Sequence, residues 1–339
     1  MMSIDKWSLL AGIRFLLASI VAIKHLDDYT PLGWLGFIAA FGTFEAILGF
    51  LLISGYSISV SYGKQPDGFL FRRILRLYPI YLTAMAATYL AFVLLKVTKP
   101  SLFSLLINAL FLNQLVTTNS FVGPAWSLSL EFWLYCLTPF LMGLSKPNTR
   151  LIVWGSFACY LLYTVFRTAS HLPYYSGVGF GLNLGLLSFI WIAGLRLARA
   201  TAEDKTAMRD IGLIFGGHLA LTAVIQFGFR LKHHALADFF RHDVIAYVMP
   251  SATLVCVYYV FKALVVPDRP NLHRSGFLRM LGDISYPLYL LHAAIYAMLA
   301  HFGLKTPLLF YLAAVIVSAG VYWSLDFYSR RRHQQIGVT

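Results

Sequence analysis

Two ionisable residues, Arg14 and His25, lie in an apolar stretch near the start of the chain, LLAGIRFLLASIVAIKHL. Such side chains are costly inside a membrane, so an Arg and a His in one spanning helix indicate a functional site by default. A rise of about 1.5 Å per residue separates them by roughly 16 Å along the helix axis, and steps of about 100° return them to nearly the same face. A cation and a titratable imidazole so arranged suit a reaction centre. In the structural alternative, Arg14 extends to the membrane interface and His25 marks the far end of the helix.

A basic pair, Arg73 and Arg76, begins another apolar stretch, in RRILRLYPIYL. Residues three apart share a helix face, so the two guanidinium groups can hold phosphates by charge-assisted hydrogen bonds. Pro79 follows and leaves a backbone carbonyl free, because proline has no N–H to donate. The competing interpretation is that these arginines, with Arg72 and Lys64, anchor the cytoplasmic end of a membrane helix.

A carboxylate, Glu131, lies roughly two turns into the apolar stretch GPAWSLSLEFWLYCLTPF. A carboxylate in hydrocarbon is neutralised unless it has a partner, and the basic residues named above are the available partners. We therefore expect Glu131 to be charged and paired. In the alternative, Glu131 is a structural group whose hydrogen bonds join two helices. Trp126 and Ser127, at the start of the same stretch, are candidate substrate contacts.

Two further apolar stretches carry weaker candidates. GFLLISGYSISV supplies Ser54, a candidate substrate contact, and Gly55, whose small size allows the close approach of another helix or of a substrate. ISYPLYLLHAAIY contains Tyr286, another candidate contact, and His292. A single histidine in a membrane helix is more often a packing residue, and we interpret His292 in this way.

A polar segment, RLKHHALADFFRHD, contains several residue types that can bind a metal ion: His233, His234, Asp238, His242 and Asp243. Their spacing matches no familiar metal-binding motif, and a solvated loop is the simpler interpretation. The three cysteines fall within apolar stretches and also lack metal-ligand spacing. We expect no metal.

The stretches that carry these residues are those of a polytopic membrane protein. The 339 residues are 59% hydrophobic and 12% charged, whereas a soluble domain has about 25% charged residues. Apolar runs of the length needed to cross a bilayer predict an all-α fold of about ten transmembrane helices. A shorter run at 101–116, interrupted by Asn108 and Asn113, predicts an interfacial or re-entrant helix. The predicted spans lie near residues 8–27, 34–61, 74–97, 125–144, 151–168, 178–198, 209–228, 244–263, 283–302 and 307–328.

The basic residues behind the net charge of +13 are distributed as this topology predicts. With the N-terminus inside, we count roughly 18 Lys and Arg residues on the inner side and about eight on the outer side, the positive-inside pattern. We therefore expect cytoplasmic termini, a lipid bilayer as the surroundings, and no nucleic-acid partner.

The motifs together resemble those of the acyltransferase-3 family of integral membrane acyltransferases. Arg14 and His25 match the family's R-x10-H pair, and Arg73 and Arg76 match its R-x-x-R element. ISGY, WSLSLEFWLY and ISYPLYLLH resemble its ISGF, WSLsvEFqfY and iSYslYLwH elements, in the same order along the chain.

The resemblance implies one transmembrane acyltransferase domain over residues 1–339, at the bacterial inner membrane. It implies transfer of an acyl group, usually acetyl from acetyl-CoA, to a hydroxyl of a carbohydrate or glycolipid. His25 is then the general base or a transient acyl carrier, Arg14 stabilises negative charge or holds the donor, and Glu131 orients the basic groups. Arg73 and Arg76 meet the CoA phosphates.

The chain departs from the family pattern at Ala11, where an acidic residue is usual, and this raises the interest of Glu131. A transporter or flippase is the alternative function, since intramembrane Arg, His and Glu can form a substrate or ion path. The lack of an internal repeat and the ordered motifs favour the enzyme. The sequence leaves open the acceptor, the acyl chain and the oligomeric state.

Overall fold

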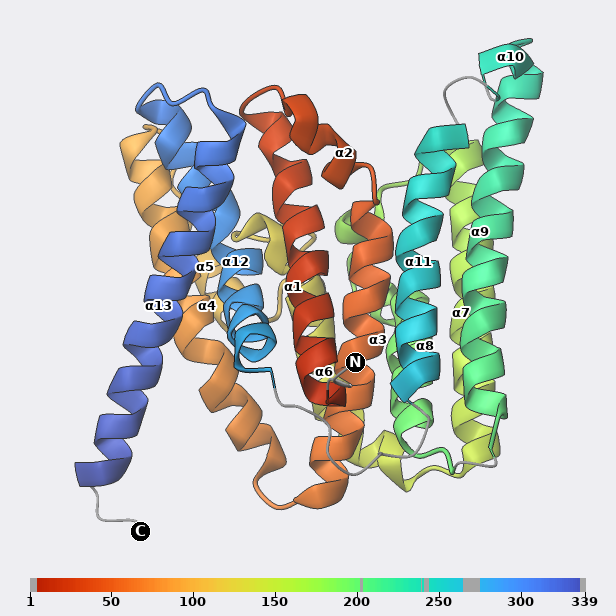
Figure 1. The fold of residues 1–339 in the computed structure, drawn as a ribbon, viewed down its shortest axis with the longest axis horizontal. Helices are drawn as coiled ribbons and strands as arrows, with labels where there is room; N and C mark the ends of the chain where they lie inside the picture. The colour runs from red at the N-terminus through yellow and green to blue at the C-terminus, as the bar shows by residue number, and fades with distance from the viewer. Residues whose placement is uncertain (1–4, 202–203, 239, 241–243, 265–274, 336–339) are drawn as a thin grey trace.

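The computed structural model describes residues 5–201, 204–238, 240, 244–264 and 275–335, and in these ranges the chain is helical, without a strand. The helices stand side by side, with α4, α5, α12 and α13 at one side, α7, α9 and α11 at the other, and α1, α3 and α6 between them (Figure 1). The helices are α1 (Lys6–His25), α2 (Gly36–Ala39), α3 (Thr43–Lys64), α4 (Phe69–Leu94), α5 (Leu102–Ala109), α6 (Trp126–Gly143), α7 (Lys146–Ser170), α8 (Leu182–Ala198), α9 (Thr206–Lys232), α10 (Leu236–Asp238), α11 (Val244–Leu264), α12 (Gly276–His301) and α13 (Pro307–Gln335).

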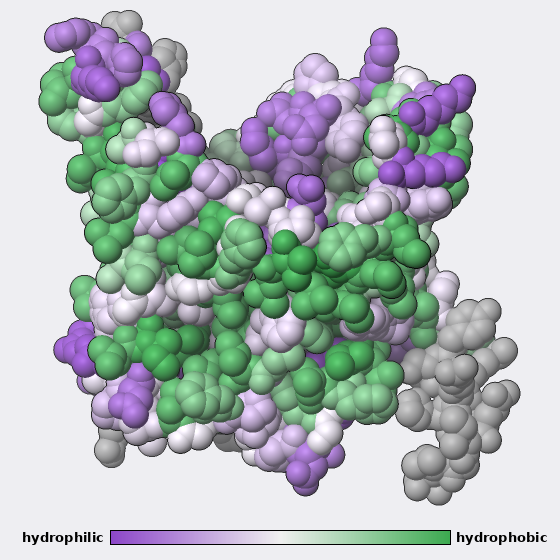
Figure 2. All heavy atoms as spheres, turned by 180° about the vertical axis from the view of Figure 1, so that it is seen from behind, coloured by the Kyte–Doolittle hydropathy of each residue, from purple (hydrophilic) through white to green (hydrophobic). Residues whose placement is uncertain are grey.

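The chain is a multi-pass membrane protein. In the described part of the chain, 7 helices are long and apolar enough to cross a membrane: α1, α3, α4, α7, α9, α11 and α13. On the rear face, hydrophobic side chains form a band between hydrophilic ends (Figure 2). The predicted spans 125–144, 178–198 and 283–302 correspond to α6, α8 and α12, which are helical but outside this set. Helices α6 and α12 carry several buried polar side chains. Helix α8 is almost wholly enclosed by protein.

The predicted span at 34–61 is too long at its start. Residues Gly36–Ala39 form the separate short helix α2, and α3 begins only at Thr43. Gly42 between them has φ 85°, in the left-handed region that glycine adopts without a steric penalty. The chain therefore turns at Gly42 before it enters the bundle.

Side chains cap the N-terminal ends of α1 and α12, which lie next to each other. Asp5 accepts hydrogen bonds from the backbone N–H groups of Trp7 and Ser8, and Arg279 of α12 lies 3.4 Å from its carboxylate. Burial alone would raise the pKa of Asp5, but the hydrogen bonds from Ser8 and Trp7 and the charge of Arg279 lower it overall. Ser275 caps α12 in turn. The starts of the two helices are thus tied together.

Small residues let pairs of helices approach closely. A Cβ atom on Gly55 of α3 would lie 1.9 Å from the Trp191 carbonyl oxygen of α8, and one on Gly194 of α8 would lie 2.2 Å from the Leu52 carbonyl oxygen. On the other side of α3, Gly282 of α12 packs against Ala11 of α1, where an added Cβ would lie 2.4 Å from the Ala11 Cβ. The departure from the family pattern at Ala11 therefore has a packing reason, because a larger side chain there would meet α12.

Residues 101–123 enter the protein without crossing it, as the sequence predicts. The short helix α5 contains Asn108 and is followed by irregular chain that contains Asn113, and both asparagines are fully buried. The Ser129 hydroxyl donates to the carbonyls of Phe111 and Asn113, and the Trp133 indole also donates to Phe111. Irregular backbone at membrane depth requires such partners. This segment leads into α6, whose first residues are buried inside the bundle.

Candidate active site

A cavity of about 1350 Å³ opens among α1, α3, α4, α6, α12 and α13. Pockets for drug-sized ligands are about 300–1,000 Å³, so this one can accept a larger and extended molecule. Its wall includes seven of the sequence-predicted site residues: Arg14, Ser54, Arg73, Arg76, Ser127, Glu131 and Tyr286. Residues from opposite ends of the sequence thus line one space.

Basic side chains line the cavity near the turn between α3 and α4, which lies at the lower end of the bundle (Figure 1). Arg73 and Arg76 both line it, as their spacing predicts, together with Lys64 and Arg72. Arg72 is held by the loop carbonyls of Gln65 and Asp67. This end of the cavity can bind a polyanion.

Arg73 and Arg76 differ in how they are held. Arg73 donates to the Ser61 hydroxyl and lies 5.5 Å from the centroid of the Phe69 ring, and its buried Nε has no hydrogen-bond partner. Arg76 is exposed and forms no ion pair with the described residues. Two guanidinium groups therefore keep unused hydrogen-bond donors at this end.

Deeper in the cavity, Glu131 is the centre of a hydrogen-bonded group. Its carboxylate accepts from the hydroxyls of Ser54 on α3 and Tyr135 one turn along α6. The Trp191 indole N–H of α8 lies 3.2 Å from the Ser54 oxygen. Glu131 is therefore a hydrogen-bonded group that joins three helices and also faces the cavity.

Arg14 of α1 is a basic residue in the same cavity wall as Glu131. Arg14, Glu131 and Asp283 of α12 all line the cavity. The Nε of Arg14 is buried without a hydrogen-bond partner, and no salt bridge joins Arg14 to a carboxylate among the described residues. Among the described residues no ion pair joins Glu131 to a basic residue, so its expected pairing stays a prediction.

His25 lies at the other end of α1 from Asp5 and does not line the cavity. Its Nδ1 lies 2.7 Å from Nε2 of His292 on α12, and the two rings stack with centroids 5.0 Å apart. His292 is fully buried, and its Nδ1 lies 2.9 Å from the Leu288 carbonyl oxygen. The contact with His25 was not expected, because 267 residues separate the two histidines.

The cavity ends close to this histidine pair. Tyr289, one of its lining residues, lies one helical turn before His292, with ring centroids 6.5 Å apart. The Tyr289 hydroxyl bonds to the Ser127 hydroxyl at 2.7 Å and donates to the Pro124 carbonyl at 3.0 Å. The start of α6 and Tyr289 thus separate the inner end of the cavity from the histidines.

The other sequence candidates have different surroundings. The Tyr286 hydroxyl donates to the Leu77 carbonyl of α4 at 3.2 Å. Trp126 lies outside the cavity wall and packs edge-on against Tyr174. His242 and Asp243 of the polar loop lie outside the described residues. Within the described ranges, no group of three or more His, Cys, Asp or Glu side chains can hold a metal ion.

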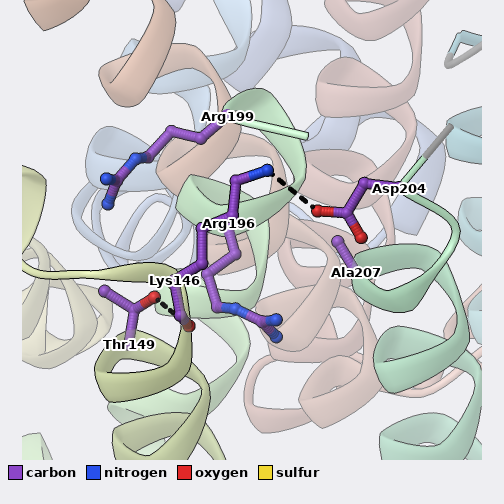
Figure 3. A pocket seen from close by; sticks show the side chains of 6 residues that line it. All are labelled: Lys146, Thr149, Arg196, Arg199, Asp204 and Ala207. Atoms are coloured by element: carbon purple, nitrogen blue, oxygen red, sulfur yellow. Dashed lines mark hydrogen bonds and ion pairs between the residues drawn. The ribbon is translucent and has the colours of Figure 1, made fainter. Parts of the chain in front are cut away.

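A second polar cavity, of about 10 Å³, lies among α7, α8 and α9; this volume admits about one water molecule. Lys146 reaches across it to Asp204 at 3.2 Å (Figure 3). Hydrogen bonds from Thr206 and Lys146 lower the pKa of the Asp204 carboxyl. Below it, Arg196 and Arg150 both pair with Asp210. Lys146, Arg150 and Arg196 each have an acidic partner within the protein, and Arg199 donates to the carbonyls of Leu141 and Leu144, so we interpret this cavity as structural.

Comparison with known proteins agrees with the motifs. The sequence profile described as "Acyltransferase domain" (Acyl_transf_3) matches residues 8–326. A protein of Acidianus two-tailed virus named "Putative acetyltransferase ORF330" is 23% identical over 291 residues, which cover 83% of this chain and 78% of the viral protein. No solved structure matches.

Proposed function

The chain belongs to the acyltransferase-3 family and is a membrane acyltransferase, and we propose that it transfers acetyl from acetyl-CoA to a hydroxyl of a carbohydrate or glycolipid. The observation that carries this proposal is the large cavity, which joins a cationic end at Arg73 and Arg76 to polar groups at Arg14 and Glu131. A domain over residues 1–339 at a bacterial inner membrane, with its cationic end in the cytoplasm, completes the proposal.

The cationic end fits the chemistry of coenzyme A. Coenzyme A carries a 3′-phosphate and a pyrophosphate, and guanidinium groups bind phosphate oxygens through paired N–H donors. Arg73, Arg76 and Lys64 all line this end of the cavity and provide these charges. The pantetheine arm then follows the cavity toward Ser127 and Tyr289.

Arg14 and Glu131 act on the acyl end of the donor. Arg14 lines the same cavity, and its guanidinium can stabilise the negative charge that develops on the thioester oxygen during attack. Glu131 balances the charge of Arg14 and holds Ser54 and Tyr135 in fixed orientations.

His25 acts as the general base. The acceptor O–H gives its proton to the imidazole while its oxygen attacks the thioester carbonyl carbon. The C–S bond then breaks, the coenzyme A thiolate takes up a proton, and the products are the ester and free coenzyme A. An unperturbed imidazole titrates near pH 6.5, so activity should fall as the pH drops through the pKa of His25, because the protonated ring cannot accept a proton.

The test is acetyl transfer by the purified protein in lipid nanodiscs. Labelled acetyl-CoA and a cell-surface glycan preparation should give labelled glycan and free thiol in equal amounts. His25→Ala should abolish both and leave expression near normal. Retained transfer by His25→Ala would remove His25 from the mechanism, and the absence of thiol release by the wild type with any acyl-CoA would remove the donor assignment. Mass spectrometry of surface glycans from a deletion strain identifies the acceptor.

A further inference from the structure

The hydrogen bonds of His292 determine which nitrogen of His25 carries a proton. The Leu288 carbonyl can only accept, so Nδ1 of His292, 2.9 Å from it, carries a hydrogen. A neutral imidazole has one N–H and one acceptor nitrogen, and Nε2 of His292 is therefore an acceptor. Nδ1 of His25, 2.7 Å from that nitrogen, must be the donor.

This assignment leaves the other nitrogen of His25, Nε2, with a free lone pair. No hydrogen bond to that nitrogen occurs among the described residues, and His25 is partly exposed whereas His292 is fully buried. Only His25 can therefore meet a substrate hydroxyl, and it does so with the nitrogen that can accept a proton.

We propose that His292 is a positioning residue, which holds His25 in the tautomer and orientation required of a general base. The arrangement is that of a base whose far nitrogen donates to a fixed acceptor, with a neutral imidazole as the acceptor. When His25 takes the proton of the acceptor hydroxyl at Nε2, the bond from its Nδ1–H to His292 becomes charge-assisted and stronger. His292 itself exchanges no proton with the substrate.

The fold supports this role, because α1 and α12 are held together on both sides of the pair. The Asp5–Arg279 ion pair joins their starts, Gly282 packs against Ala11, and Thr30, beyond the end of α1, donates to the Lys305 carbonyl at 2.8 Å. The Tyr296 ring, one turn beyond His292, lies 5.6 Å from it and fills the space behind it. The two imidazoles thus have little freedom to separate.

The proposal rests on the proposed function, and the test separates the two. His292→Phe keeps a planar ring of similar size but removes the acceptor nitrogen. We expect kcat for acetyl transfer to fall by about 10²-fold or more, the usual contribution of general base catalysis, while KM for acetyl-CoA stays unchanged. His218→Phe, at another buried histidine that bonds to Tyr160 of α7, is the control for loss of a buried imidazole and should keep kcat.

A second pair of variants covers a failure of His292→Phe to fold. In His292→Gln the side-chain oxygen can take the position of Nε2 and accept from His25, whereas His292→Leu has similar bulk and no acceptor. We expect His292→Gln to be at least about tenfold faster in kcat than His292→Leu. Equal kcat values for Gln and Leu, or wild-type kcat in His292→Phe, would show that His292 only packs. A wild type without transfer would instead overturn the proposed function.

Discussion

At the scale of single residues, Glu131 is a carboxylate in the cavity wall with two hydroxyl partners, and this environment predicts the effect of neutralising it. Glu131→Gln keeps an oxygen that can accept from Ser54 and Tyr135 but removes the charge opposite Arg14. We expect folded protein with transfer reduced at least about tenfold, equivalent to about 1.4 kcal/mol of transition-state stabilisation.

Initial rates of thiol release measure this effect. The matched control is Glu45→Gln on α3, because Glu45 contacts His218 at 3.3 Å and lies outside the cavity wall. If Glu131→Gln kept the wild-type rate, Glu131 would be a structural link between α3 and α6 and nothing more.

Arg73 and Arg76 are expected to act on the donor alone. Alanine at either position should raise KM for acetyl-CoA with a smaller change in kcat, because a phosphate contact far from the reacting bond contributes uniform binding. The loss should shrink at high salt, where ionic screening already weakens the wild-type contact.

Titration of the apparent KM against ionic strength gives the measurement. Arg209→Ala removes an exposed cation at the start of α9, outside the cavity wall, and serves as control. Unchanged KM in both cavity variants would make the pair topology anchors.

The residue patterns predicted many of the residues that line the cavity, but not which of them contact one another. Spacing alone places Arg73 and Arg76 on one face, and a local motif indicates Glu131. The sequence could not reveal that Glu131 bonds to Ser54 or that His25 bonds to His292, because these contacts depend on the register between helices that are distant in sequence. One local signal was available: Tyr135 lies four residues after Glu131, where a helix brings side chains together.

At the scale of helices, the α3–α8 contact depends on the absence of side chains. A Cβ on Gly55 would collide with the Trp191 backbone, and overpacking of this kind costs about 1–3 kcal/mol. Gly55→Ala should therefore lower the midpoint of thermal unfolding in detergent. Gly63→Ala on the same helix has open space around the added atom and should leave stability unchanged or slightly higher, since alanine favours helix. Equal midpoints in the two variants would contradict the close packing.

The apolar runs predicted helices at 125–144, 178–198 and 283–302, and α6, α8 and α12 lie there, although these three are outside the 7 helices that are long and apolar enough to cross a membrane. The helices α6 and α12 carry Glu131 and His292, which have hydrogen-bond partners inside the bundle and lower the hydropathy of the two helices. The turn at Gly42 was missed because the residues around it are as apolar as the helices that they join. The hydropathy of a helix is therefore the weakest guide to a membrane span in the helices that carry the polar site residues.

At the scale of the whole molecule, the proposed reaction requires the cationic end of the cavity and His25 to lie toward opposite faces of the membrane. Arg72 and Lys64 line the cavity by the α3–α4 turn, whereas His25 ends α1 at the other end of the bundle (Figure 1). The positive-inside pattern assigns the α3–α4 turn to the cytoplasm. Acetyl-CoA would then enter from the cytoplasm, and the base would act nearer the outer face.

Single cysteines test this orientation in a background in which Cys136, Cys159 and Cys256 are replaced by alanine. Asp67→Cys, in the exposed α3–α4 turn, and Asp27→Cys, exposed just beyond His25, report the two ends. We expect a membrane-impermeant maleimide to label Asp27→Cys in intact cells and Asp67→Cys only after permeabilisation. The reverse pattern would place the cationic end of the cavity outside the cell, where acetyl-CoA is absent, and the donor path proposed above would be untenable.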